Sequence, residues 1–96
     1  MATVAIRWLG QQGTVTPSSL SASSGDDVTW TADGSQATVT FPDEAIFGAK
    51  EAVISDGGSE TFTVRPDAPT GEHDCPVRCE NDKQGDGTPP VRLIID

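Results

Sequence analysis

Three residues in the C-terminal third of the chain have side chains that could bind a metal ion. His73, Cys75 and Cys79 lie within seven consecutive residues, 73–79. An imidazole together with thiolates is a suitable ligand set for Zn(II) or Cu(I). Thiols near an imidazole could also take part in redox chemistry. The sequence therefore allows a metal-binding protein, holding copper or zinc, or a redox protein that uses these three residues.

The spacing of these residues sets a geometric condition on such a site. If residues 72–79 form one strand, alternation places all three side chains on one face. Residues two apart would then be separated by ~6.5 Å and residues four apart by ~13 Å, so the three converge only if the strand ends or bulges near Pro76. The simpler interpretation is that Cys75 packs as a small apolar residue and Cys79 lies at the mouth of a loop.

Other patterns typical of active sites do not occur in the chain. There is no Gly-x-Ser-x-Gly elbow, phosphate-binding loop or dinucleotide fingerprint. Residues 82–87 place oxygen-bearing side chains at alternate positions, as calcium loops do, but Leu93 stands where an EF-hand needs a bidentate Glu. We therefore expect a protein that is not an enzyme.

Composition limits the size of the protein and the class of its partners. A chain of 96 residues has room for one domain, residues 1–96, with one core. Its 15 acidic and six basic residues give a formal net charge of −9. Nucleic acids and anionic membranes attract clustered Lys and Arg, so neither is an expected partner. A protein partner is compatible with an acidic surface, which also keeps a small domain soluble.

The first residues of the chain show no export signal. Residues 1–8 lack both a basic segment and an apolar stretch of the required length, so the chain as given predicts a cytoplasmic protein. A secreted or periplasmic chain from which a leader had been removed would look the same. The compartment matters for the thiols, which stay reduced in the cytoplasm and can form a disulfide outside it.

Short stretches of alternating apolar and polar residues recur between turn signals, which is typical of a β-sandwich. Asp33-Gly34 predicts a tight turn that joins residues 27–32 and 36–41 into a hairpin. Pro17 interrupts residues 14–22, which suggests an edge strand with a break. Further strands are expected at residues 3–9, 52–54, 60–65, 72–79 and 91–95. The pattern predicts an all-β fold of about seven strands and no helix.

Residues 42–51 are ambiguous, because they fit a loop, a half-turn of helix or a short strand. Ile46 and Phe47 are the apolar residues in this segment. They are candidate anchors for a protein partner, and the alternative is that they cap one end of the core.

Two segments resemble a known family. Residues 17–30 follow the pattern Pro-x-x-apolar-x-apolar-x-x-Gly-Asp-x-Val-x-aromatic. Residues 71–77 resemble the pattern Gly-x-Tyr-x-aromatic-x-(Cys or Val), with His73 in place of the Tyr and Cys75 in place of the aromatic residue. Together with Phe62-Thr63-Val64 and the apolar residues 91–95, these segments resemble the cupredoxins and their metal-free bacterial relatives. The resemblance implies a single small Greek-key β-sandwich. In copper-binding members it also implies two His, one Cys and usually an axial Met as ligands.

The sequence departs from that ligand set. The resemblance places the first His in residues 33–37, where there is none, and the ligand Cys at Val77. His73 is the only histidine, and Met1 is the only methionine. The resemblance therefore implies a metal-free variant without a cofactor.

The expected function is that of a non-catalytic accessory or protein-interaction module without a type 1 copper site. Loops at the ends of a rigid sandwich are its candidate contact surfaces, namely residues 11–13, 42–48 and 80–90. The alternative remains a copper, zinc or redox protein that uses His73, Cys75 and Cys79.

Overall fold

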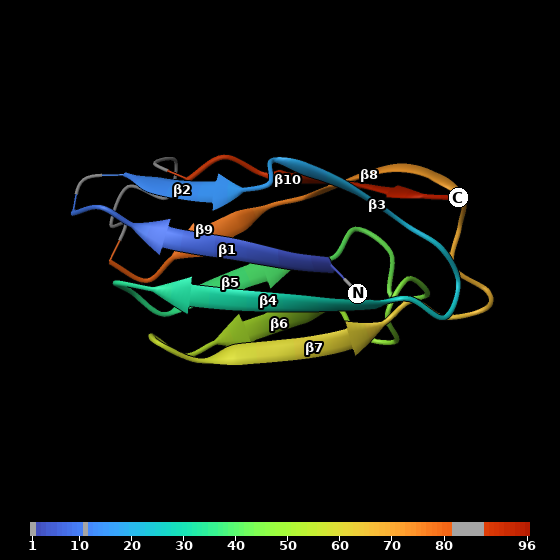
Figure 1. Ribbon diagram of the computed structural model, residues 1–96, viewed down its shortest axis with the longest axis horizontal. Coiled ribbons are helices and arrows are strands. Elements are labelled where there is room, and N and C mark those ends of the chain that lie inside the picture. The colour runs from blue at the N-terminus through green and yellow to red at the C-terminus, as the bar shows by residue number, and fades with distance from the viewer. Residues whose placement is uncertain (1, 11, 82–87) are drawn as a thin grey trace.

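The structure is a computed structural model that describes residues 2–10, 12–81 and 88–96. In this part of the chain there are ten strands and no helix that could span a membrane. The strands are β1 (Ala2–Trp8), β2 (Gly13–Thr16), β3 (Ser19–Ala22), β4 (Asp27–Asp33), β5 (Ala37–Thr40), β6 (Glu51–Ile54), β7 (Ser59–Thr63), β8 (Gly71–Cys75), β9 (Val77–Cys79) and β10 (Val91–Ile95) (Figure 1).

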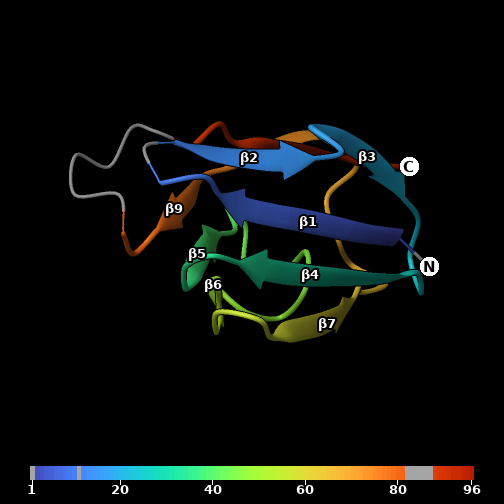
Figure 2. The ribbon, with the colours of Figure 1, turned by 60° about the vertical axis from the view of Figure 1, so that its left-hand side comes forward.

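The strands form a two-layered sandwich. One layer is a four-stranded sheet in the order β2-β1-β4-β7, and the other consists of two three-stranded sheets, β3-β10-β8 and β6-β5-β9. Figure 1 shows β1 and β4 in front of β5 and β9, and Figure 2 shows β3 and β10 along the edge next to β2. Alternate residues of the strands point into one shared hydrophobic core. The prediction of an all-β sandwich is confirmed.

Two prolines divide two of the eight expected strand segments and so account for the ten strands of the structure. Pro17 separates β2 from β3, and Pro76 separates β8 from β9. Because proline has no N–H to donate to a ladder, the chain can leave one sheet at these points and join another. β2 pairs with β1 whereas β3 pairs with β10, and β8 pairs with β10 whereas β9 pairs with β5. The prediction of one continuous strand over residues 72–79 was therefore wrong.

The predicted hairpin between residues 27–32 and 36–41 was also wrong. Both segments are strands, but β4 lies between β1 and β7, whereas β5 lies between β6 and β9. The turn after Asp33 carries the chain from one layer to the other, so that Trp30 of β4 and Val39 of β5 are both fully buried in the core. Asp56 holds this turn by accepting a hydrogen bond from the N–H of Gly34 at 2.9 Å.

The centre of the core is an aromatic cluster. Trp30 of β4 lies 5.8 Å from Phe41 and 6.5 Å from Phe47, measured between ring centroids, and the rings of Phe41 and Phe47 are 4.8 Å apart. Phe62 of β7 packs against both phenylalanines. Tilted and edge-on arrangements of this kind stabilise a core beyond the burial of area.

Gly34→Ala is expected to destabilise the protein more than Gly57→Ala. Both glycines have positive φ, +87° and +78°, which costs an L residue about 1 kcal/mol or more. A Cβ at Gly34 would also lie 2.6 Å from the carbonyl oxygen of Trp8, whereas one at Gly57 meets nothing within 4 Å. Chemical denaturation measures both free energies of unfolding, and equal losses in the two variants would contradict the close packing of the turn against β1.

Candidate functional site

The break at Pro76 determines where the three candidate metal ligands lie. His73 and Cys75 belong to β8, and Cys79 is the last residue of β9, in a different sheet. The strand therefore does end near Pro76, as it must if the side chains of His73, Cys75 and Cys79 are to come together. Within the described part of the chain, however, no group of three His, Cys, Asp or Glu side chains is placed to hold a metal ion.

The side chain of His73 is half-buried and already has a hydrogen-bond partner. Its Nε2 lies 2.8 Å from the carbonyl oxygen of Pro69. Because a carbonyl oxygen only accepts, Nε2 carries the proton in this bond. The bond ties β8 to the loop before it, and only Nδ1 would be left to bind a metal ion.

Both cysteines are buried free thiols. The thiol of Cys75 donates weakly to the carbonyl oxygen of His73 at 4.0 Å, and Sγ of Cys79 accepts from the hydroxyl of Thr88 at 3.6 Å. Burial, reinforced by the nearby carboxylate of Asp74, raises the pKa of Cys75 from an ordinary 9.0 to about 12. Since the thiolate is the reactive and metal-binding form, Cys75 is inert at neutral pH in this structure.

The residues present do not fit a type 1 copper ion. Such a site takes two imidazoles, and the chain has one histidine. In the turn where the resemblance places the first ligand, buried Ser35 accepts a hydrogen bond from the N–H of Asn81 at 3.1 Å. The side-chain amide of Asn81 donates to the carbonyl oxygen of Gly34 at 3.2 Å. At the position expected for the ligand Cys, Val77 is buried in the core.

Ile46 and Phe47 are not surface anchors. Both are buried, and Phe47 packs against the rings of Trp30, Phe41 and Phe62. The chain between β5 and β6 contains turns rather than a strand, and the N–H of Arg65 donates to the carbonyl oxygen of Ile46 at 2.9 Å. The two residues cap the core, which is the alternative that the sequence left open.

The exposed apolar residues lie elsewhere. Leu9, directly after β1, is 55 % exposed, and Val53 in β6 is 47 % exposed. The exposure of Leu9 could have been predicted from the alternation in the first strand. Val4, Ile6 and Trp8 point inward, so the residue after Trp8 must point outward. Residues 82–87, whose alternating oxygen-bearing side chains only resemble a calcium loop, lie outside the described residues, as do Gln11 and the centre of the candidate contact loop 80–90.

The buried thiol of Cys75 predicts a loss of stability in alkaline solution. Its pKa is raised in the folded state, so this contribution to stability is complete below pH 9.0 and is lost progressively as the pH rises toward about 12. Across that window the free energy of unfolding should fall by up to about 1.4 kcal/mol per pH unit from this group. Denaturation at a series of pH values should show a shallower fall for Cys75→Ala, and parallel curves would contradict the prediction.

Comparison with known proteins places the fold. No family model and no curated protein matches the chain. Among solved structures, a purple cupredoxin from Nitrosopumilus maritimus is 14 % identical over 100 % of both chains, with a TM-score of 0.66. A reduced Cu(I) form of an amicyanin variant is 16 % identical over 99 % of this chain and 81 % of that one, with a TM-score of 0.63.

A further amicyanin, from Paracoccus versutus, is 11 % identical over 99 % of this chain and 80 % of that one, with a TM-score of 0.59. These identities are low, so the likeness concerns the path of the backbone and not the ligands. It agrees with the resemblance of residues 17–30 and 71–77 to the same family. The protein has a cupredoxin-like fold.

Proposed function

We propose that this protein is a non-catalytic interaction or accessory module that uses a cupredoxin-like sandwich without a type 1 copper site. The observation that supports this most strongly is the presence of a single histidine, where such a site takes two. In addition, Nε2 of His73 is engaged by Pro69, and a buried valine, Val77, occupies the position expected for the ligand Cys.

The turn after β1 is the contact surface that the geometry favours. Leu9 is the more exposed of the two large apolar residues found on the described surface. Its N–H donates to the carbonyl oxygen of Gln12 at 2.8 Å, and the preceding Trp8 packs against the core. An apolar side chain on a turn fixed in this way loses little conformational entropy on binding, which favours its use as an anchor.

The alternative is a copper, zinc or redox protein that uses His73, Cys75 and Cys79. It has less support, because metal binding would require deprotonation of a thiol whose pKa is raised to about 12. It would also require the two strands that carry the cysteines, β8 and β9, to move relative to each other.

Metal titration separates the two functions. Reduced, purified protein is expected to contain no stoichiometric copper or zinc by mass spectrometry. Its absorbance should stay unchanged on addition of Cu(I), Cu(II) or Zn(II). In the described residues, thiolate and imidazole ligands are not arranged in advance to bind the ion. Uptake of one metal ion per chain that is lost in the double variant Cys75→Ser, Cys79→Ser would establish the alternative instead.

Substitution of the exposed apolar residues tests the contact surface. Leu9→Ser is expected to abolish the binding of a partner identified by affinity capture, because it removes the apolar anchor. Val53→Ser is the matched control, since it removes an exposed apolar side chain from β6. Equal retention of the partner by both variants would rule out the turn after β1 as the contact.

A further inference from the structure

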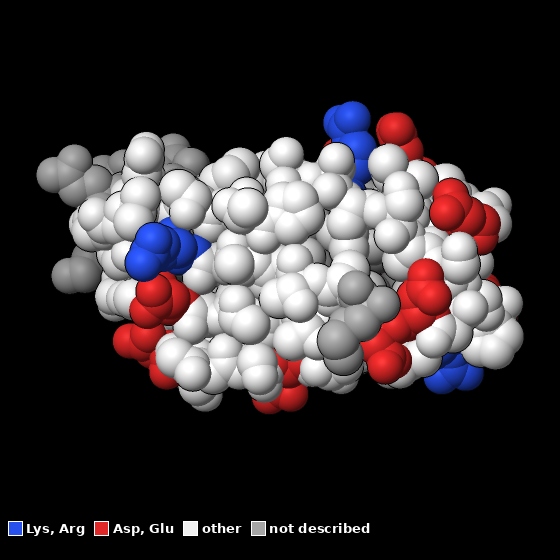
Figure 3. Space-filling model, in the orientation of Figure 1, with Lys and Arg blue, Asp and Glu red and all other residues white. Residues whose placement is uncertain are grey.

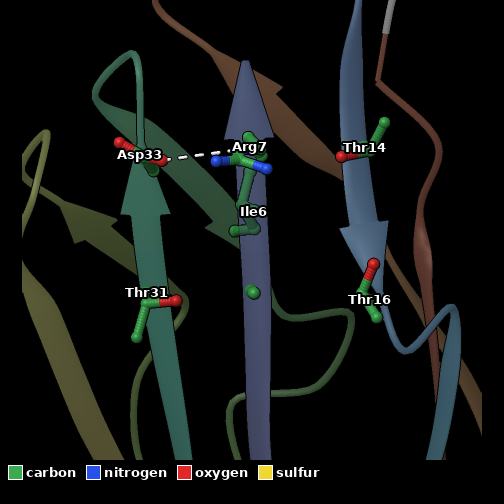
Figure 4. Close-up of a pocket in the computed structure, with 7 residues that line it drawn as sticks. Ile6, Arg7, Thr14, Thr16, Thr31 and Asp33 are labelled. Carbon is green, nitrogen blue, oxygen red and sulfur yellow. Dashed lines mark ion pairs between the residues drawn. The ribbon is translucent and has the colours of Figure 1, made fainter. Parts of the chain in front are cut away.

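The outer face of the four-stranded sheet contains a depression. Its volume is about 370 Å³, and it lies away from the core on the solvent side of three neighbouring strands (Figure 4). Seven residues line it, namely Ala5, Ile6, Arg7, Thr14, Thr16, Thr31 and Asp33.

The depression arises from the register of these strands. Ala5 of β1 is paired with Thr16 of β2 on one side and with Thr31 of β4 on the other. A methyl group therefore stands between two larger side chains and forms a low floor. In the next outward-facing row, Arg7 is paired with Asp33, and Nε of Arg7 lies 3.4 Å from Oδ2 of Asp33. This ion pair closes one end of the depression.

The groups around the floor select a class of ligand by their chemistry. Arg7 supplies hydrogen-bond donors and Asp33 supplies acceptors. The hydroxyls of Thr14 and Thr16 can do both, whereas that of Thr31 donates to the carbonyl oxygen of Val4 at 3.5 Å and offers an acceptor. The ion pair is locally neutral, so a free anion or cation gains little there. No aromatic ring lines the depression to stack on a planar ligand. A neutral, saturated molecule with several hydroxyl groups and a small apolar face satisfies all of these groups.

The surface around the depression has the same character. Thr3, Thr29 and Thr61 form the neighbouring outward row, and the hydroxyls of Thr29 and Thr61 are 2.9 Å apart. Figure 3 shows that Asp, Glu, Lys and Arg lie toward the ends and edges of this face, while its centre over β1 and β4 is free of them. A ligand longer than one ring could therefore continue across the sheet over hydroxyl and methyl groups.

We propose that this depression binds a neutral carbohydrate, with one sugar ring over Ala5 and ring hydroxyls bonded to Arg7 and Asp33. The side chains of Arg7 and Asp33 are 66 % and 69 % exposed, so the bonds compete with water and the dissociation constant should lie in the millimolar range. Leu9 does not line the depression, so the site does not depend on the proposed interaction with a protein.

The test is a titration of the isotope-labelled full chain, followed by the chemical shifts of its backbone amides. The probes are D-glucose, D-galactose, N-acetyl-D-glucosamine and cellotriose, with sodium phosphate as the anionic comparison. Saturable shifts at Ala5, Arg7 and Thr31 are expected with at least one sugar. Binding should weaken about tenfold in Asp33→Asn, which loses a charged acceptor, and in Ala5→Leu, which fills the floor.

Thr3→Val is the control for the three single-ring sugars, because it changes the same outer face of β1 outside the depression and should leave their affinity unchanged. Ala5 and Asp33 point to solvent, so these variants should keep the dispersed amide spectrum of a folded protein. The proposal is overturned if no sugar gives a saturable shift, or if phosphate alone shifts these amides. Sugar binding that Asp33→Asn and Ala5→Leu leave unchanged would overturn it as well.

Discussion

The packing of Trp30 between the two layers is the interaction on which the rest of the structure depends. Trp30 is the largest fully buried side chain in the described part of the chain, and it reaches from β4 to phenylalanines that follow β5. Its Nε1 has no hydrogen-bond partner among the described residues, which costs about 1–3 kcal/mol. The burial of a large aromatic ring offsets that cost, because such rings contribute 150–250 Å² of buried area each, about 4–6 kcal/mol.

Local sequence patterns predicted the strands but not their partners. Alternation predicted residues 91–95, which match β10, and residues 27–32, which lie within β4. The same pattern is compatible with a hairpin and with a crossing between layers. The contacts that distinguish them join residues far apart in sequence, such as Gly34 with Asp56 and Ser35 with Asn81.

For the candidate sites, too, local features could be predicted from the sequence, whereas features that depend on contacts between distant residues could not. The sequence identified Pro76 as the point that decides whether His73, Cys75 and Cys79 can meet, and the chain does break there. It could not reveal how deeply each side chain of residues 42–51 is buried, because that depends on Trp30 and Phe62 packing over the segment. The depression over Ala5 depends on the register of three strands, β2, β1 and β4. Of these, β1 and β4 are parallel neighbours in the sheet, although β2 and β3 lie between them in the sequence. No pattern within a single strand could have shown it.

The central position of β10 has a consequence for how the chain folds during synthesis. In its sheet β10 lies between β3 and β8, and each of these outer strands is paired there only with β10. While residues 91–95 are still inside the ribosome, β3 and β8 have no neighbour in this sheet, and β8 presents an unsatisfied backbone. Parallel pairing of β10 with β3 also closes a loop of about 70 residues, which is slow because the entropy of closure must be lost first. The sheet is therefore completed only after residues 91–95 have left the ribosome, and the nascent chain is most susceptible to aggregation before that.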